Sequence, residues 1–148
     1  MKDFMVYALK QAKEAYHNDE VPIGAVIVKD NKIIARGQNR REKTQNALMH
    51  AEICAIDKAC KKLKSWRLDG CQMYVTLEPC PMCAGAIVNA RIEKVIYACK
   101  QTTSQDDLLS AIFKSERLNH KVELEQDIKY EKEASYLLTS FFESKRNK

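Results

Sequence analysis

Two short segments place strong metal ligands at the starts of two expected helices. The first is His50-Ala51-Glu52, and the second is Pro79-Cys80-Pro81-Met82-Cys83. Each is weak evidence alone, because a C-x-x-C pair also occurs as a redox pair, as half of a structural zinc site or as two core cysteines. Together they supply one histidine and two cysteines, the three protein ligands of a catalytic zinc site whose fourth position is open to water. The fold must therefore bring both helix starts together.

The surroundings of these residues suit zinc chemistry. Cys80 and Cys83 lie in a turn that enters a helix, where free backbone N–H groups and the helix dipole favour a thiolate. Two thiolates nearly neutralise the ion, so a nearby carboxylate is more useful for moving protons than as a further ligand. Glu52, in the first helical turn, can direct its carboxylate towards a bound water. We expect His50, Cys80 and Cys83 to hold one Zn²⁺ per subunit and Glu52 to be catalytic.

The remaining composition sets broad limits. A chain of 148 residues with 45% hydrophobic residues fits one domain, and a formal net charge of +5 favours an anionic partner without requiring one. No apolar run approaches the roughly 18 residues of a membrane helix, and residues 1–5 lack the apolar stretch of a signal peptide. We expect a cytoplasmic protein without a membrane segment. Four further cysteines show no second ligand pattern and are expected to be structural: Cys54, Cys60, Cys71 and Cys99.

Hydrophobic periodicity predicts helices and strands that alternate over much of the chain. The first helix starts at Asp3, a residue type that favours the N-cap, and Asp30-Asn31 predicts a hairpin turn. A strand, helix and strand over 73–98 indicate parallel neighbours. The expected helices are 3–16, 50–63, 84–90, 108–113 and 129–142, the expected strands are 24–28, 33–35, 73–77, 94–98 and 122–124, and 39–49 is expected to be a loop. These elements predict a three-layer α/β/α fold with a mixed central sheet of about five strands and helices on both faces.

At the metal-ligand segments the sequence resembles the cytidine deaminase superfamily, and more closely the bacterial tRNA adenosine deaminases. H-x-E followed by P-C-x-x-C is the signature of zinc-dependent nucleobase deaminases. Residues 21–26 resemble the first-strand segment of the family, and residues 74–86 resemble its metal-binding block. The likeness covers most of the chain. It implies a cytidine deaminase-like fold, with residues 1–148 forming a single zinc-dependent deaminase domain.

The resemblance also implies a reaction and a partner. It predicts hydrolytic conversion of adenosine to inosine at the wobble position of a tRNA anticodon loop, whose bases can splay out to reach a pocket. Asn39 corresponds to a base-contacting asparagine of the family, although alone it would be read as a turn-stabilising residue. Pro22, Ala51 and Pro79 are expected to shape the pocket walls. Family members of this kind are typically homodimers, so a homodimer is expected.

Two segments depart from the family pattern. Residues 46–49, Asn-Ala-Leu-Met, replace the usual Asp-Pro-Thr-Ala, and residues 101–105 lack a glycine-rich stretch. Both border the substrate cleft in the family, where loops select the substrate while zinc carries the chemistry. One alternative is therefore a deaminase of a free base or nucleoside, such as cytosine, guanine or cytidine. Another is a zinc-stabilised RNA-binding module that has lost catalysis.

The end of the chain offers a candidate RNA contact. Lys145, Arg146 and Lys148 can bind phosphates, with Phe141 and Phe142 orienting the last helix or touching the RNA loop. A solvated basic end and two core phenylalanines explain the same residues equally well.

Overall fold

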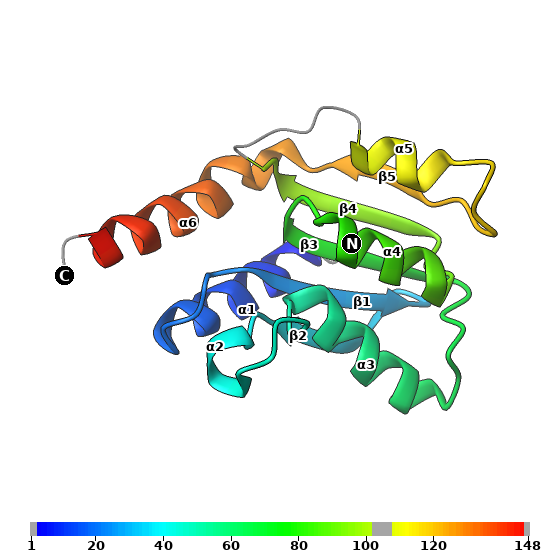
Figure 1. Cartoon of the computed structure of the whole chain (residues 1–148), viewed down its shortest axis with the longest axis horizontal. Coiled ribbons are helices and arrows are strands. Elements are labelled where there is room, and N and C mark those ends of the chain that lie inside the picture. Colours follow the sequence, from blue (N-terminus) through cyan, green and yellow to red (C-terminus); the bar gives the residue numbers. More distant parts are fainter. Residues whose placement is uncertain (1–2, 102–107, 147–148) are drawn as a thin grey trace.

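The computed structural model describes residues 3–101 and 108–146 of the chain. One five-stranded sheet lies between two layers of helices (Figure 1), which confirms the expected α/β architecture. The strands are β1 (Gly24–Lys29), β2 (Lys32–Gln38), β3 (Cys71–Leu77), β4 (Lys94–Cys99) and β5 (Glu123–Gln126). The helices are α1 (Met5–His17), α2 (Arg41–Thr44), α3 (Ala51–Leu63), α4 (Pro81–Ala90), α5 (Leu108–Lys114) and α6 (Glu131–Arg146), with a 3-10 turn at Ile128–Tyr130 before α6.

The sheet is mixed, with the strand order β2-β1-β3-β4-β5. β1 pairs antiparallel with β2 and with β3, whereas β3, β4 and β5 are parallel. Asp30 and Asn31 have positive φ angles of 50° and 61°, as a tight hairpin turn between twisted strands requires. Both the predicted hairpin and the parallel pairing of β3 with β4 are confirmed.

Each face of the sheet is covered by its own set of helices. Ala25 and Ile27 pack with α3, α4 and α5, while the alternate residues Val26 and Val28 pack with α1 and α6. Because successive side chains of a strand point to opposite faces, a strand buried on both sides is apolar throughout. This explains the continuous apolar run of β1. It also places α3 and α4, which carry the two ligand segments, on the same face.

A close contact brings the start of α3 against the sheet. A Cβ atom at Gly37 in β2 would lie 2.2 Å from the carbonyl oxygen of Ala51 and 2.6 Å from the backbone nitrogen of Ala55. Small residues also line the buried side of the helix at Ala55 and Ala59. The backbone of α3 can therefore lie directly on β2. This contact sets the position of His50, which immediately precedes the helix.

Two local expectations were wrong. Phe4, not Asp3, is the N-cap of α1, and the Asp3 carboxylate instead accepts hydrogen bonds from Tyr130 Oη and Lys129 Nζ. The stretch expected to be a loop contains the short helix α2. Its first backbone N–H groups, those of Glu42 and Lys43, donate to the buried carboxylate of Glu20 at 3.0 and 2.7 Å. Both differences arise from contacts between residues far apart in the sequence.

The described helices include none that combines the length and the apolar character needed to span a bilayer.

Candidate metal centre and substrate cleft

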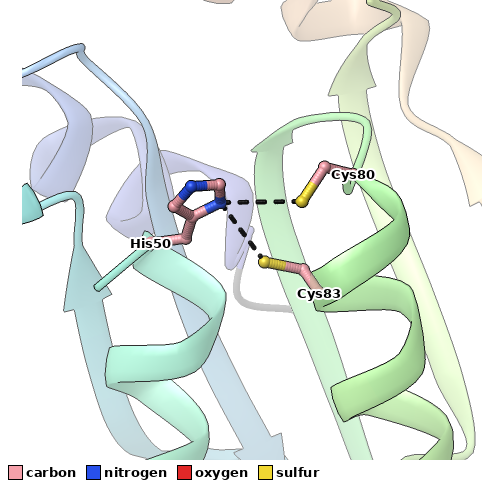
Figure 2. A group of neighbouring side chains, drawn as sticks. All are labelled: His50, Cys80 and Cys83. Carbon is pink, nitrogen blue, oxygen red and sulfur yellow. Dashed lines mark hydrogen bonds between the residues drawn. The ribbon is translucent and has the colours of Figure 1, made fainter. Parts of the chain in front are cut away.

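The three predicted metal ligands come together between the starts of α3 and α4. His50 is the N-cap of α3 and Cys80 is the N-cap of α4, and both have extended backbone conformations. Pro81 occupies the first turn of α4, where its missing N–H leaves no helical hydrogen bond unmade. Cys83 lies one turn further along the same helix. Figure 2 shows the imidazole reaching from one helix start towards the two sulfur atoms of the other.

The distances between these side chains fit a zinc ion. His50 Nδ1 lies 3.6 Å from Cys80 Sγ and 3.5 Å from Cys83 Sγ (Figure 2), and all three ligand atoms lie within 4.8 Å of one another. In a tetrahedral site with usual Zn–N and Zn–S bond lengths, the nitrogen and sulfur ligands are about 3.6 Å apart. The cluster therefore matches the edges of a zinc tetrahedron. With three protein ligands, one corner of that tetrahedron is left for water.

The three side chains of the cluster differ in how their pKa values are shifted. Hydrogen bonding from the Cys83 thiol lowers the pKa of Cys80 to about 4, with a further contribution from His50 and against the effect of burial. The same hydrogen bond and burial raise the pKa of Cys83, and the bond to Cys80 raises the pKa of His50. Cys80 is thus a thiolate at neutral pH. Such a thiolate beside a second sulfur and an imidazole is a donor set to which zinc binds well.

Glu52 lies in the first turn of α3, two residues after His50. Its side chain is 4% exposed, and this burial raises the pKa of the carboxyl group to about 7. A carboxyl group that titrates near neutral pH can both accept and release a proton under working conditions. The raised carboxyl pKa is compatible with the catalytic role expected for Glu52, which stays a prediction.

A cavity of about 570 Å³ opens beside the cluster. His50, Ala51 and Asn39 are among its lining residues, and α6 contributes six more. Pro22 and Pro79 are buried but are not among the lining residues. The remaining lining residues are Val21, Ile23, Arg41, Leu77, Cys99, Lys100, Gln101, Ser135, Leu138, Thr139, Phe142, Glu143 and Arg146. The lining thus comes from six separate stretches of the chain, and of the metal-ligand cluster it includes His50.

Asn39 is almost fully buried, at 5% exposure, and its amide already has protein partners. Its Oδ1 atom accepts the backbone N–H of Arg41 at 3.1 Å, which orders the start of α2. Its Nδ2 atom lies 3.5 Å from the carbonyl oxygen of Val21, a long contact for a hydrogen bond. One amide N–H of Asn39 is thus held only weakly by the protein.

The two segments that depart from the family pattern have ordered contacts of their own. Asn46 Oδ1 accepts the backbone N–H of Leu48 at 2.9 Å, which forms a local turn and leaves the Leu48 side chain 55% exposed. Gln101 lines the cavity and donates from Nε2 to the carbonyl oxygen of Glu78 at 2.9 Å. The remainder of that second segment, 102–105, lies outside the described residues.

Sequence reasoning did not identify most of the cavity wall. Arg41 was missed because it belongs to the unpredicted helix α2, and Glu20, which orders α2, was missed with it. The part of the lining that α6 forms could have been found from the sequence, since Ser135, Leu138 and Phe142 recur at helical spacing. Of the basic end residues, Arg146 lines the cavity, Lys145 pairs with Asp19 at 2.5 Å, and Lys148 lies outside the described residues.

Comparisons with known proteins agree with this geometry. A family model described as MafB19-like deaminase matches residues 1–146. The tRNA-specific adenosine deaminase of Bacillus subtilis (strain 168) is 46% identical over 98% of this chain and 90% of its own length. A solved structure from a study of A-to-I editing by tRNA:A34 deaminases at the wobble position of transfer RNA has a TM-score of 0.84 and 39% identity, covering 91% of this chain and 98% of that one.

A second solved structure is a guanine deaminase from Bacillus subtilis, with a TM-score of 0.66 and 36% identity over 100% of this chain and 96% of that one. The relatives thus share one reaction type, deamination, although their named substrates differ. The similarity extends over nearly the whole chain and includes the segments that carry the metal-ligand cluster. The chain therefore belongs to the MafB19-like deaminase family and is an enzyme of the deaminase class.

Proposed function

We propose that residues 1–148 form a single zinc-dependent domain that deaminates adenosine to inosine at the wobble position of a tRNA anticodon. The observation that carries the chemistry is the His50–Cys80–Cys83 cluster beside a cavity and a buried Glu52. The full-length similarity to proteins named tRNA-specific adenosine deaminase supports the substrate. A non-catalytic RNA-binding module is not supported, because those full-length relatives are named as enzymes.

His50, Cys80 and Cys83 would hold the zinc ion. When bound, zinc supplies a Lewis acid that makes a water molecule nucleophilic at neutral pH. Glu52 takes a proton from the attacking water and passes one to the exocyclic nitrogen of adenine. Water adds at the carbon that bears the amine, the carbon–nitrogen bond breaks, and adenosine and water become inosine and ammonia. The buried position of Glu52 keeps its carboxyl pKa near 7, which suits both transfers.

The cavity gives the target base a place outside its stack. A single-stranded loop can release one base into such a pocket at little energetic cost. Asn39 is our candidate for contact with the base, because it lines the cavity and its Nδ2 atom has only a long contact with Val21. Ala51 lines the cavity beside His50, and its small side chain leaves room for the base. The pocket-shaping roles of Pro22 and Pro79 stay predictions.

The decisive experiment measures inosine in tRNA after incubation with the purified zinc-loaded protein. We expect inosine at the wobble position, and Glu52→Gln should lower the rate by about 100-fold or more, because general acid–base catalysis contributes at least that much. Glu125→Gln is a matched control, since Glu125 is an exposed carboxylate on β5 that pairs with Lys94. Equal activity of wild type and Glu52→Gln would contradict the mechanism.

A free-base substrate is the second candidate, favoured by the similarity to a guanine deaminase. The same protein preparations should be incubated with guanine, cytosine, cytidine, adenine and adenosine while ammonia release is followed. Ammonia from a free base with no inosine formed in any tRNA would select this candidate. Inosine in tRNA with no ammonia from free bases would exclude it.

We further propose that the enzyme acts in the cytoplasm as a homodimer. All six cysteines are outside disulfide bonds, which suits a reducing compartment. The homodimer rests on the resemblance to deaminases in which the partner subunit helps to complete the cleft. Light scattering on the zinc-loaded protein should report twice the chain mass of 17.0 kDa. A mass of one chain at working concentration would contradict the dimer.

A further inference from the structure

Helix α6 presents two different faces. One face packs towards α1 and the sheet through Ala134, Leu137 and Phe141, and Leu138, at the border of this face, also packs against the same core. The other face forms a wall of the cavity, and its residues recur at positions i, i+3, i+4, i+7, i+8 and i+11, which share one side of a helix. These cavity-facing residues are Ser135, Leu138, Thr139, Phe142, Glu143 and Arg146. The position of α6 therefore decides the shape of the cavity on this side.

The two halves of α6 are held in different ways. Ala134 is 1% exposed and belongs to the core cluster of α1 and the sheet, so the first half is anchored by burial. The second half projects beyond the ends of the strands (Figure 1). Its contacts include Tyr16, at the end of α1, and Asp19, which follows that helix and pairs with Lys145. The second half thus depends on α1 rather than on the sheet.

Tyr16 makes two contacts with this second half. Its hydroxyl group lies 2.9 Å from Ser140 Oγ in a partly buried hydrogen bond. Its ring meets the ring of Phe141 edge to face, with centroids 5.7 Å apart and planes at 77°. Phe141 in turn meets Phe142 edge to face at 5.6 Å, and Phe142 lines the cavity. An aromatic chain therefore runs from Tyr16 to the cavity wall, and such ring pairs have a preferred geometry.

We propose that Tyr16 is a positioning residue, which holds the cavity-facing side of α6 in place for the substrate. The inference rests on the proposed function, because it concerns the cavity that would take the RNA. Tyr16 is not among the residues that line the cavity. Its effect passes through Ser140 and Phe141 to Phe142. Tyr16 is outside the His50–Cys80–Cys83 cluster as well, so it contributes to substrate binding and leaves the chemical step unchanged.

Steady-state kinetics with tRNA separate these two effects. Tyr16→Leu removes the hydrogen bond and the ring contact. We expect KM to rise roughly five- to tenfold while kcat stays within about twofold of wild type. The reason is that ordering α6 when the substrate binds costs binding free energy and does not change the chemical step. Tyr16→Phe and Ser140→Ala each remove the same hydrogen bond and should raise KM by about two- to fivefold. The double variant Tyr16→Phe/Ser140→Ala should equal either single variant, because both lack one shared bond.

Lys13→Ala is the matched control. Lys13 Nζ pairs with Glu133 at 3.3 Å, and this pair joins the same two helices at the anchored end of α6. Both side chains are about half exposed, so the pair should contribute little and KM should stay unchanged. A KM increase in Lys13→Ala as large as that of Tyr16→Leu would overturn the inference. A Tyr16→Leu variant with reduced kcat and unchanged KM would also overturn it.

Hydrogen–deuterium exchange gives a readout that needs no substrate. In zinc-loaded Tyr16→Leu the amides of residues 139–146 should exchange at least fivefold faster than in wild type, while those of α3 and α4 are unchanged. Unchanged exchange in 139–146 overturns the inference, whichever substrate the enzyme uses. If the wild type deaminates a free base and no tRNA, the proposed function fails, and the KM comparison with that base then decides whether Tyr16 positions the wall.

Discussion

A buried carboxyl group beside three metal ligands gives Glu52 an unusual proton affinity. The side chain is almost fully buried, and this burial is the main reason that the carboxyl pKa rises to about 7 from an ordinary value of 4.5. An exposed glutamate would be ionised at neutral pH and would hold no proton to donate as a general acid. The same burial that suits Glu52 to proton transfer also destabilises its charged form in the folded protein.

The cost of burying the charged form predicts a pH-dependent difference in stability between wild type and Glu52→Gln. This difference is expected in protein from which a chelator has removed the zinc. Below pH 4.5 Glu52 is protonated in both the folded and the unfolded chain. The free energy of unfolding should therefore change with pH by the same amount in wild type and in Glu52→Gln. As pH rises from 4.5 through 7, the unfolded chain loses the proton first, and wild type should lose stability relative to Glu52→Gln by roughly 3 kcal/mol. Urea unfolding of both proteins at pH 5 and pH 8 measures the difference. A constant difference between them would contradict this account.

At the scale of elements, the metal ligands depend on how α3 lies on the sheet. Gly37 in β2 lets the first turn of α3 approach to backbone contact, and His50 directly precedes that turn. On the other side of the sheet, Gly24 lets α1 approach in the same way, since a Cβ atom added there would lie only 2.1 Å from the carbonyl oxygen of Ala8. Glycine at these two positions therefore sets the spacing between the sheet and a helix on each face.

Gly37→Ala should both destabilise the protein and weaken zinc binding. The added methyl group would overlap backbone atoms of α3, which cannot rotate away, so we expect a loss of about 3 kcal/mol in the free energy of unfolding. Displacement of His50 should lower zinc affinity as well, as measured by competition with a chelating dye. Gly85→Ala in α4 is the control, because no atom lies within 4 Å of its added Cβ. That variant should be more stable by about 0.5–1 kcal/mol, since alanine favours a helix.

At the scale of the whole molecule, the metal-ligand cluster lies between the starts of two helices that pack in the same core. α3 packs on β2 and β1, and α4 follows β3, so an ion between them joins distant parts of the chain. Zinc bound to the folded state alone stabilises it by about 4 kcal/mol when free zinc is 1,000 times Kd. For a chain of this length that corresponds to about 10 °C in Tm.

Removal of zinc by a chelator should therefore lower the Tm of the wild type by about 10 °C. Cys80→Ser should start from a lower Tm and show little further change on chelation, because the site lacks a ligand. Cys60→Ser should keep the full response, since Cys60 lies in α3 away from the ligand cluster. Scanning calorimetry with and without chelator measures all three. A wild-type Tm that is the same with and without chelator would argue against a bound metal.

Local sequence was sufficient for most of the elements and for the choice of candidate metal ligands. His50, Cys80 and Cys83 were predicted because ligand types at fixed spacing and the starts of two helices leave a strong local pattern, and the structure brings the three together. The strands and the β1–β2 hairpin were predicted because side-chain periodicity and turn residues act over a few positions. The catalytic role of Glu52 and the substrate contacts stay predictions, which the variants and the activity measurements test.

Tertiary structure alone decided the cleft. Helix α2 exists because Glu20, far from it in the sequence, accepts its first N–H groups, and Asp3 pairs with Tyr130 rather than capping α1. Part of the cavity lining comes from α6, which Tyr16 contacts although it is more than 100 residues away in the sequence. These features depend on contacts between distant residues, which no local pattern encodes. The sequence by itself thus determined the candidate metal ligands and most of the elements, because both leave local patterns, and the packing of those elements determined the shape that a substrate meets.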